Sequence, residues 1–482
     1  MNKPLRRLSA AVLVMFGLLL VNANYLQVVR ADALHNDSRN SQRLNQEAYA
    51  VKRGPILVGG KPVASSVATT DALKYQRTYA SGKLFAPATG FYSLVSGTKA
   101  IEAAENSILN GTDNSLFVRR VLDMLTGVPP EGGSVSLTLN AKAQRAAYQG
   151  LAGRKGAVAA VNPTTGAILA LVSSPSYDPN LLASHDPTVA LANFEKLDRD
   201  PDKPMLDRAL NETYNPGSTF KVVTAAAALE SGKYTKDSKV YNKASLDLPL
   251  TTANLPNENG RPCTPGDATL TDALAYSCNA AFGAIGLDLG ADALREQASR
   301  FGFGTRFTVP MPSAVSRFPS GINAPQTAQS AIGQFSVTAT PLQMAMVAAA
   351  VGNRGELMSP YLVQDVRGPD LSVLDSTKPE SLGEAMSPQS AQQLTSMMVT
   401  VVDSGTGSNG QIPGIKVAGK TGTAQQGGGR RPHAWFISFA PAENPKVAVA
   451  VIVENGGNAQ EISGNQIAAP IARAVMRAVL GR

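Results

Sequence analysis

Five short strand patterns divide into two groups that lie far apart in the sequence. Residues 157–161 and 167–172 are apolar runs on either side of N-P-T-T-G at 162–166, and this arrangement predicts a β-hairpin. Three further strand patterns come near the other end of the chain, at residues 415–425, 435–439 and 446–453. Because the two groups need a common sheet to bury their apolar side chains, the residues between them must fold around it.

Helical patterns occupy the space between and after the strands. Residues 218–230 are rich in Ala and end before Gly232, which suits the C-terminal cap. Residues 341–351 are apolar and begin with Pro341, which suits a first helical turn, and residues 467–480 close the chain with a further helix. Strands and helices together predict an α+β fold in which helices cover an antiparallel five-stranded sheet.

The N-terminus predicts a membrane anchor. Lys3, Arg6 and Arg7 precede an apolar run at 8–21, which residues 25–29 extend to about the ~20 residues that span a bilayer. The basic flank predicts a cytoplasmic N-terminus, so that the rest of the chain lies outside the cell membrane. A cleaved signal peptide is the alternative, but the nearest small-x-small site, at residues 31–33, lies far behind the run.

The length of 482 residues, of which 43% are hydrophobic, predicts more than one domain. Residues 1–34 form the cytoplasmic tail and the anchor. Residues 35–150 are polar and mixed, with a strand pattern at 134–139 and a helix pattern at 141–151. The pattern changes near residue 155, and we take 151–482 as a second, larger domain.

The composition excludes several classes of function. The net charge of +8 suits an anionic membrane surface or cell wall, while the absence of Lys/Arg runs and of zinc-finger spacing argues against a nucleic acid partner. Three widely spaced histidines and the lack of a C-x-x-C give no metal site, and we expect no cofactor. Cys263 and Cys278 are either a disulfide, which an extracytoplasmic location permits, or two buried thiols.

A serine with a lysine three residues later supplies a nucleophile and a base. Ser218 and Lys221 lie at the start of the predicted helix behind Pro216 and Gly217, so both side chains share one face. A lysine works as a base only when burial or a cationic neighbour keeps it neutral. We expect Lys420 to be that neighbour.

The S-x-x-K spacing of Ser218 and Lys221 is by itself weak evidence of an active site, because Ser96 and Lys99 have the same spacing. S-x-N at 277–279 is equally common, and 38–40 matches it too. The rarer element is K-T-G-T at 420–423, on a predicted strand. A formal match to a phosphate-binding loop at 414–421 lacks the following helix, so we take it as a false positive.

In their order and context these motifs resemble class B penicillin-binding proteins, the D,D-transpeptidases of the bacterial cell wall, of the actinobacterial penicillin-binding protein A type. The residues that carry the resemblance are Y-N-P-G-S-T-F-K at 214–221, S-C-N at 277–279, K-T-G-T-A at 420–424, S-Y-D-P-N at 176–180, T-P-L-Q-M-A at 340–345 and A-W-F-I-S-F-A-P at 434–441. R-G-P-I at 53–56 is similar to the family's R-G-x-I signature, and 57–133 is weakly covered. G-Q-F at 333–335 departs from the G-Q-G of many relatives.

The resemblance implies a role for each motif residue. Ser218 attacks the carbonyl of the penultimate D-Ala of a stem peptide, Lys221 takes its proton, and Ser277 relays a proton to the leaving amine. Backbone N–H groups of Ser218 and Thr423 form the oxyanion hole. The donor peptide lies along the strand edge at 416–424. The residues that hold it are Asn279, Lys420, Thr421, Gly422 and Thr423.

The resemblance also implies the penicillin-binding transpeptidase and serine β-lactamase-like fold, with a smaller non-catalytic pedestal or dimerisation domain at 35–150. We expect a cell-membrane protein that crosslinks peptidoglycan during growth or division and is acylated by β-lactams. A membrane glycosyltransferase of the shape or division type is the expected partner.

Three alternatives remain on the same fold. A D,D-carboxypeptidase would use water as acceptor, and a β-lactamase or β-lactam sensor would keep the same Ser-Lys chemistry. A class A β-lactamase needs a Glu in E-x-x-L-N between the S-x-N and the K-T-G, and no Glu there fits. A non-enzymatic scaffold is the third alternative, which the intact motifs oppose.

Overall fold

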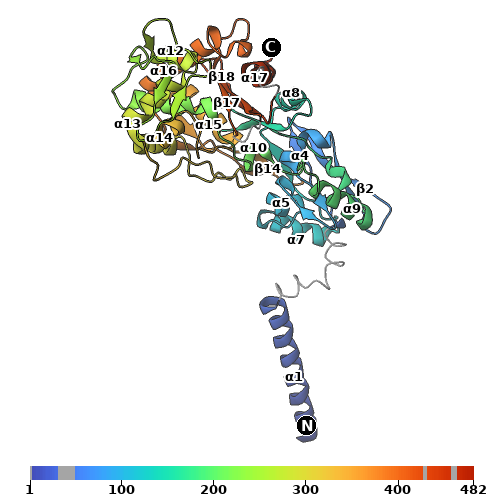
Figure 1. Ribbon diagram of the computed structural model, residues 1–482. Helices are drawn as coiled ribbons and strands as arrows, with labels where there is room; N and C mark the ends of the chain where they lie inside the picture. The colour runs from blue at the N-terminus through green and yellow to red at the C-terminus, as the bar shows by residue number, and fades with distance from the viewer. Residues whose placement is uncertain (1–2, 31–48, 427–430, 457–463) are drawn as a thin grey trace.

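The computed structural model describes residues 3–30, 49–426, 431–456 and 464–482. Figure 1 shows a body of two parts, one around β17 and β18 and one around β2 and α5, with helix α1 (Lys3–Asn24) standing apart from both. The S-R-N match at 38–40 lies outside the described residues.

The larger part is built on the five-stranded sheet that the sequence predicts. Its order is β17-β18-β19-β7-β8, and every neighbouring pair is antiparallel. The two N-terminal strands therefore join the three C-terminal ones through the pairing of β19 with β7, which confirms the predicted fold class. The strands are β7 (Gly156–Val161), β8 (Ile168–Ser174), β17 (Ala418–Ala424), β18 (His433–Ala440) and β19 (Val447–Val453).

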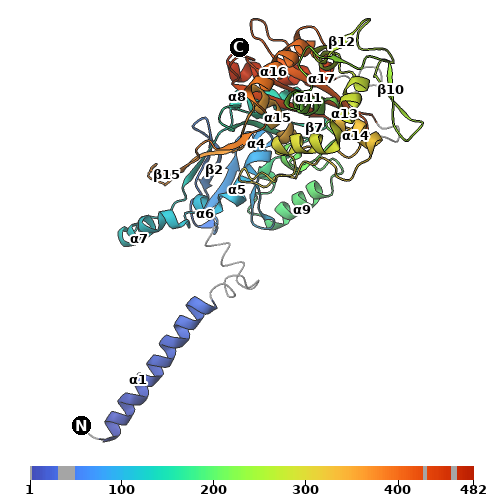
Figure 2. The same cartoon turned by 90° about the vertical axis from the view of Figure 1, so that its left-hand side faces the viewer.

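Helices cover both faces of this sheet, so its central strands are buried throughout. β19 alternates Val or Ile with Ala, and each of its residues is buried, so the alternation is one of size and not of exposure. Val158 packs with helices α8 and α17 on one face, while Ala157 and Ala159 belong to the core on the other. Figures 1 and 2 both show α8 beside α17.

The helices of the larger part agree with the predicted ones, apart from their ends. The prediction for 141–151 is confirmed, and Pro341 lies in the first turn of α15 as expected. They are α8 (Ala141–Leu151), α10 (Arg208–Asn211), α11 (Lys221–Glu230), α12 (Leu270–Ala275), α13 (Asn279–Arg300), α14 (Ala324–Ala331), α15 (Pro341–Gly352), α16 (Pro388–Asp403) and α17 (Gly464–Leu480).

The smaller part, the pedestal, contains a six-stranded sheet that two distant segments build together. Its order is β15-β14-β6-β1-β2-β3, and β6 pairs with β1 on one side and β14 on the other. Helices α4 (Gly82–Thr89), α5 (Ile101–Ala104), α6 (Asn106–Leu109), α7 (Phe117–Thr126) and α9 (Pro187–Asp198) lie around it (Figure 2). Its strands are β1 (Ile56–Val58), β2 (Lys61–Ala68), β3 (Tyr75–Tyr79), β6 (Ser134–Leu137), β14 (Val363–Arg367) and β15 (Val373–Ser376).

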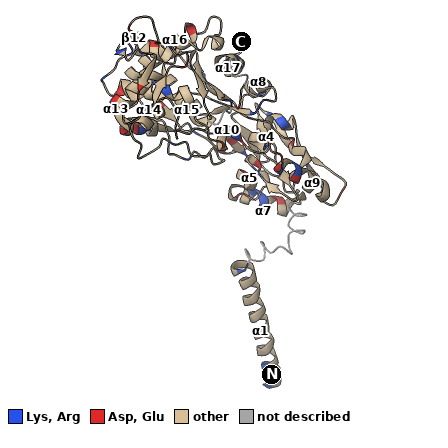
Figure 3. Ribbon diagram, viewed as in Figure 1, with Lys and Arg blue, Asp and Glu red and all other residues tan. Residues whose placement is uncertain are grey.

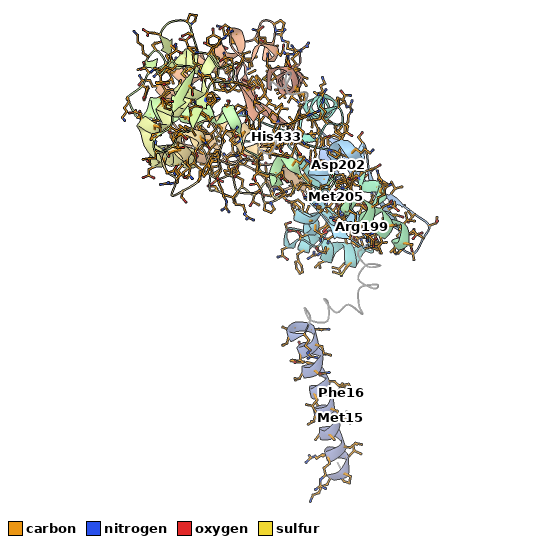
Figure 4. The ribbon with its side chains drawn as sticks, viewed as in Figure 1. Met15, Phe16, Arg199, Asp202, Met205 and His433 are labelled. Atoms are coloured by element: carbon orange, nitrogen blue, oxygen red, sulfur yellow. A yellow bond between two sulfur atoms is a disulfide. The ribbon has the colours of Figure 1, made fainter. Side chains whose placement is uncertain are left out.

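Helix α1 continues through a π-helical turn to Val29 and is long and apolar enough to cross a membrane. None of its residues is buried, and Met15 and Phe16 project outward with 63% and 65% of their surface exposed (Figure 4). Its charged residues are basic and lie near its N-terminal end (Figure 3). Such a surface is stable in lipid rather than in water.

Candidate active site

Ser218 lies in a 3-10 turn, Gly217–Phe220, and the α-helix begins only at Lys221. The prediction of a helix from Ser218 is therefore wrong by three residues. The reason is the position of Gly217, whose φ of +52° is left-handed and whose N–H donates to Gly333 O at 3.0 Å. A Cβ at Gly217 would lie 2.6 Å from the Thr423 carbonyl oxygen, so this turn packs directly against β17.

Lys221 is completely buried one turn further on. Its Nζ donates to Ser277 O and to Asn279 Oδ1, both at 2.7 Å, and approaches Ser277 Oγ at 3.3 Å. Burial and then the charge of Lys420 hold the pKa of Lys221 well below its usual value. A neutral lysine can accept a proton, which is what a base beside Ser218 requires.

Ser277 lies in the turn between α12 and α13, with a left-handed φ of +60°. Its hydroxyl is the point where the two lysines meet, because Lys420 Nζ donates to it at 2.8 Å. Asn279 follows as the first residue of α13, and its Nδ2 donates to Pro256 O at 3.0 Å. The S-x-N residues therefore stand beside Lys221.

The K-T-G-T residues lie on β17, the edge strand of the sheet. Lys420 is buried, and this burial lowers its pKa to about 7. The hydroxyl of Thr421 is 2.8 Å from that of Thr406, and a Cβ at Gly422 would lie 2.8 Å from the Thr219 methyl group. Thr423 is half-buried at the same edge. In the described residues β17 pairs only with β18, so its outer edge is available to an extended peptide.

Cys263 and Cys278 form a disulfide in the structure. Cys278 is the middle residue of the S-x-N motif, so the bridge ties the loop before α12 to the residue between Ser277 and Asn279. The bond crosses a sequence separation of 15 residues.

Three residues near the site were given no role in the sequence analysis. Thr406 reaches Thr421 from the turn after α16, and the charge of Glu258 partly opposes the lowering of the pKa of Lys221 and of Lys420 by burial. Phe335, the last residue of G-Q-F, is 41% exposed with a left-handed φ of +60°, which a residue other than glycine rarely adopts. Of these three residues, only Phe335 could be noticed in the sequence, because it ends the unusual G-Q-F at 333–335.

The second S-x-x-K and the match to a phosphate-binding loop do not form active sites of their own. Ser96 and Lys99 belong to the pedestal, where Lys99 Nζ donates to Met205 O at 2.8 Å. The stretch at 414–421 runs into β17 and is followed by β18, not by a helix, which confirms that it is not a phosphate-binding loop. His433 lies within the body of the larger part (Figure 4), on β18.

Comparison with known proteins decides the family. A model of the penicillin-binding protein transpeptidase domain matches residues 156–477, and one of the penicillin-binding protein A dimerisation domain matches residues 53–135. The chain belongs to the penicillin-binding protein family. This penicillin-binding protein is of class B and of the actinobacterial A type, which confirms the resemblance seen in the sequence.

Named relatives match this penicillin-binding protein over its whole length. The peptidoglycan D,D-transpeptidase PbpA of Mycolicibacterium smegmatis is 45% identical over 490 residues, which covers 100% of this chain and 99% of the relative. The protein of the same name from Mycobacterium tuberculosis is 46% identical over 495 residues, with the same coverage. The structure of M. tuberculosis penicillin-binding protein A as a ceftriaxone acyl-enzyme superimposes with a TM-score of 0.88 at 44% identity, covering 90% of this chain and 100% of that one.

Proposed function

We propose that this protein is a peptidoglycan D,D-transpeptidase that works through an acyl-enzyme on Ser218. The observation that carries the proposal is the pair of buried lysines, Lys221 and Lys420, that share the hydroxyl of Ser277 next to the Ser218 turn. The named relatives are peptidoglycan D,D-transpeptidases, and their structures include acyl-enzymes with β-lactams.

Acylation needs a base for the serine and an acid for the leaving group. Neutral Lys221 takes the proton of Ser218 Oγ, which forms a bond to the carbonyl carbon of the penultimate D-Ala. The N–H groups of Ser218 and Thr423 stabilise the oxyanion, and the absence of a side chain at Gly217 lets the two backbones approach closely. Ser277, in contact with both lysines, passes a proton to the departing amine of the terminal D-Ala.

Substrate binding uses the edge of β17. Lys420 faces the terminal carboxylate together with the hydroxyls of Thr421 and Thr423, since a cation among donors suits that group. Gly422 leaves room for close approach, and Asn279 holds an amide of the donor backbone. An amine from a neighbouring stem peptide then displaces Ser218 and forms the crosslink. β-Lactams enter by the same acylation and remain on Ser218.

The chain divides into a membrane anchor, a non-catalytic part and a catalytic part. Residues 1–34 anchor the protein as a single-pass helix, and residues 35–150 form most of the non-catalytic part, to which strands β14 and β15 also belong. The remainder of residues 151–482 forms the catalytic part outside the cell membrane. Lys3, Arg6 and Arg7 support a cytoplasmic N-terminus. Neither matched domain is a glycosyltransferase, so glycan strands come from a membrane glycosyltransferase of the shape or division type.

Covalent labelling by a penicillin identifies the nucleophile. A fluorescent penicillin is expected to label the full-length protein covalently in detergent, and Ser218→Ala is expected to abolish the labelling. Ser96→Ala is the matched control, because it removes the serine of the other S-x-x-K and should leave labelling intact. Labelling of Ser218→Ala would overturn the assignment.

Intact mass separates the transpeptidase from its rivals. An acyl-enzyme that persists for minutes is expected of a transpeptidase, whereas an adduct lost within seconds would show a β-lactamase. Transfer of a donor peptide to an amine, in preference to water, separates the transpeptidase from a carboxypeptidase.

A further inference from the structure

Helix α7 of the pedestal exposes large apolar side chains along one of its faces. Phe117, Met124 and Leu125 are spaced as i, i+7 and i+8, so they share one side of the helix, and Leu122 borders that side. All four are exposed, Met124 and Leu125 to 76% and 79%. We call these four residues the α7 apolar face. Such a row on one helix face, unlike a single exposed leucine, marks an interaction surface.

The polar side chains of α7 attach the helix to the rest of the pedestal. Arg119 forms an ion pair with Asp123 on the same helix and another, also at 3.2 Å, with Asp370 in the turn between β14 and β15. Arg120 Nη1 donates to Gly111 O at 3.1 Å. Because these side chains leave the helix on other sides than the α7 apolar face, the pedestal holds α7 with that face outward.

Helix α7 lies at the end of the pedestal where the chain arrives from the membrane anchor. Figures 1 and 2 both show α7 at the end of the body that faces α1, away from the catalytic part. Lys52 O accepts from the Gly132 N–H at 2.9 Å, and Lys52 Nζ pairs with Glu131 at 3.2 Å, so the start of the pedestal lies beside the loop that follows α7. Residues 31–48 connect this point to the anchor and reach at most about 65 Å.

A lipid surface suits the α7 apolar face better than a second copy of the chain does. The matched dimerisation domain includes α7, so a second copy is the rival occupant. However, ten residues make a helix only about 15 Å long, and one face of it is far smaller than the about 800 Å² that each partner buries in a stable interface. A bilayer sets no such minimum. Because α1 already holds the protein there, a weak second contact is enough.

We propose that the α7 apolar face inserts into the surface of the membrane that α1 spans. Phe117, Met124 and Leu125 enter the acyl-chain region, and Arg119 and Arg120 stay toward the headgroups and the pedestal, as in interfacial amphipathic helices. The inference is independent of the chemistry of the active site and requires only that α1 anchors the chain. One attachment leaves the body free to tilt, whereas two fix its orientation, so that the β17 edge is presented at a constant height above the membrane.

The experiment measures the depth of α7 in a bilayer. Full-length Leu125→Cys protein is reconstituted into vesicles of phosphatidylcholine and phosphatidylglycerol, and the new thiol is labelled with a polarity-sensitive fluorophore. The two native cysteines are bonded to each other and the chain has no others, so the label has one site. We expect a shift of the emission to shorter wavelength, and quenching by lipids with a nitroxide on the acyl chain at least threefold stronger than at a water-exposed site.

The water-exposed site is Leu250→Cys, because Leu250 of the catalytic part is 92% exposed. Thr126→Cys is the matched control on α7 itself, since Thr126 lies off the apolar face, and its label should be quenched less than that at Leu125. Adding Met124→Asp to the Leu125→Cys protein places a charge in the middle of the face and is expected to abolish the quenching. An unchanged midpoint of thermal unfolding shows that each variant is folded.

Equal quenching of the labels at Leu125 and Leu250, or quenching at Leu125 that survives Met124→Asp, would overturn the inference. A label at Leu125 that is shielded from water but not quenched by the nitroxide lipids, with energy transfer between labelled copies, would assign the face to a second copy and also overturn it. Full-length protein that fails to float with the vesicles would overturn the anchor together with the inference. Acylation of Ser218 by a penicillin would stand in each of these cases.

Discussion

Lys221 Nζ lies 3.3 Å from the hydroxyl of Ser277, and Lys420 Nζ donates to the same hydroxyl at 2.8 Å. Burial has the larger effect on the pKa of Lys221, and the charge of Lys420 lowers it further. The neutral form of Lys221 is the active one, so acylation speeds up as pH rises through this pKa. Lys420→Met removes the neighbouring charge and raises the pKa. We expect the acid limb of the pH profile to move to higher pH.

The measurement is the second-order rate constant for acylation by a penicillin across the acid and neutral range. Lys416→Met is the matched control, because Lys416 is an exposed lysine just before β17. The acid limb of the pH profile of Lys416→Met should coincide with that of the wild type. A Lys420→Met protein that is slower at every pH, with the limb unmoved, would restrict Lys420 to substrate binding.

Single residues of the site were predictable where a local motif carries them. Lys221 and Ser277 belong to S-x-x-K and S-x-N, and Lys420 to K-T-G, so their convergence could be expected before any contact was known. Thr406 and Glu258 reach the site through the packing of separate loops against β17 and α13. No spacing in the sequence encodes that packing, and neither residue was predicted.

At the scale of elements, the turn between α12 and α13 depends on the disulfide. Ser277 has a left-handed φ of +60°, which is costly for a residue other than glycine and requires support from its surroundings. Replacing Cys263 and Cys278 together by Ser removes a covalent link across 15 residues. We expect a loss of ~3 kcal/mol in the free energy of unfolding and slower penicillin acylation, because Ser277 is held less firmly.

Chemical denaturation and labelling kinetics measure the two effects. Wild-type protein treated with a reductant supplies the control, since it lacks the bond but keeps both sulfur atoms, and it should behave as the double variant does. A thiol count on unreduced, denatured wild type should find no free thiol. Two free thiols, or full acylation rates after reduction, would contradict the prediction.

The elements themselves were predicted better than their ends. All five strands of the central sheet follow from apolar runs and turn signals, because burial on both faces requires such runs. The start of α11 was not predicted. A helix from Ser218 fits the local sequence, but the contact between Gly217 and β17 tightens the first turn to a 3-10 turn. That contact joins residues that are distant in sequence.

At the scale of the whole molecule, a pedestal domain was expected, but the strands that residues 363–376 add to its sheet could not be predicted. Its sheet takes β14 and β15 from residues 363–376, and Ser136 on β6 donates to Asp365 on β14 across 229 residues of sequence. Short strands of mixed polarity carry too weak a pattern to show such pairing. The contribution of the second segment became visible only in three dimensions.

The same pedestal holds a buried ion cluster at the start of its first strand. Glu102 is fully buried and accepts from Arg53 Nε at 2.6 Å, from Arg77 Nε at 2.7 Å and from Tyr79 Oη at 3.1 Å. Burial alone would raise the pKa of Glu102, but the charges of Arg77 and Arg53 outweigh it and lower the pKa. Because the folded-state pKa is depressed, this carboxylate stabilises the fold above its unfolded pKa, and the contribution is lost as pH falls through the folded value.

Glu102→Gln leaves two buried guanidinium groups without a counter-charge, so we expect the free energy of unfolding to fall by about 3–5 kcal/mol at neutral pH. Glu105→Gln is the matched control one turn later. Burial raises the pKa of Glu105, so neutralising this side chain should cost nothing or stabilise slightly. Thermal unfolding followed from neutral to acid pH measures both. As pH falls and Glu102 itself becomes protonated, the gap between wild type and Glu102→Gln should close, and a gap independent of pH would assign the loss to packing rather than to charge.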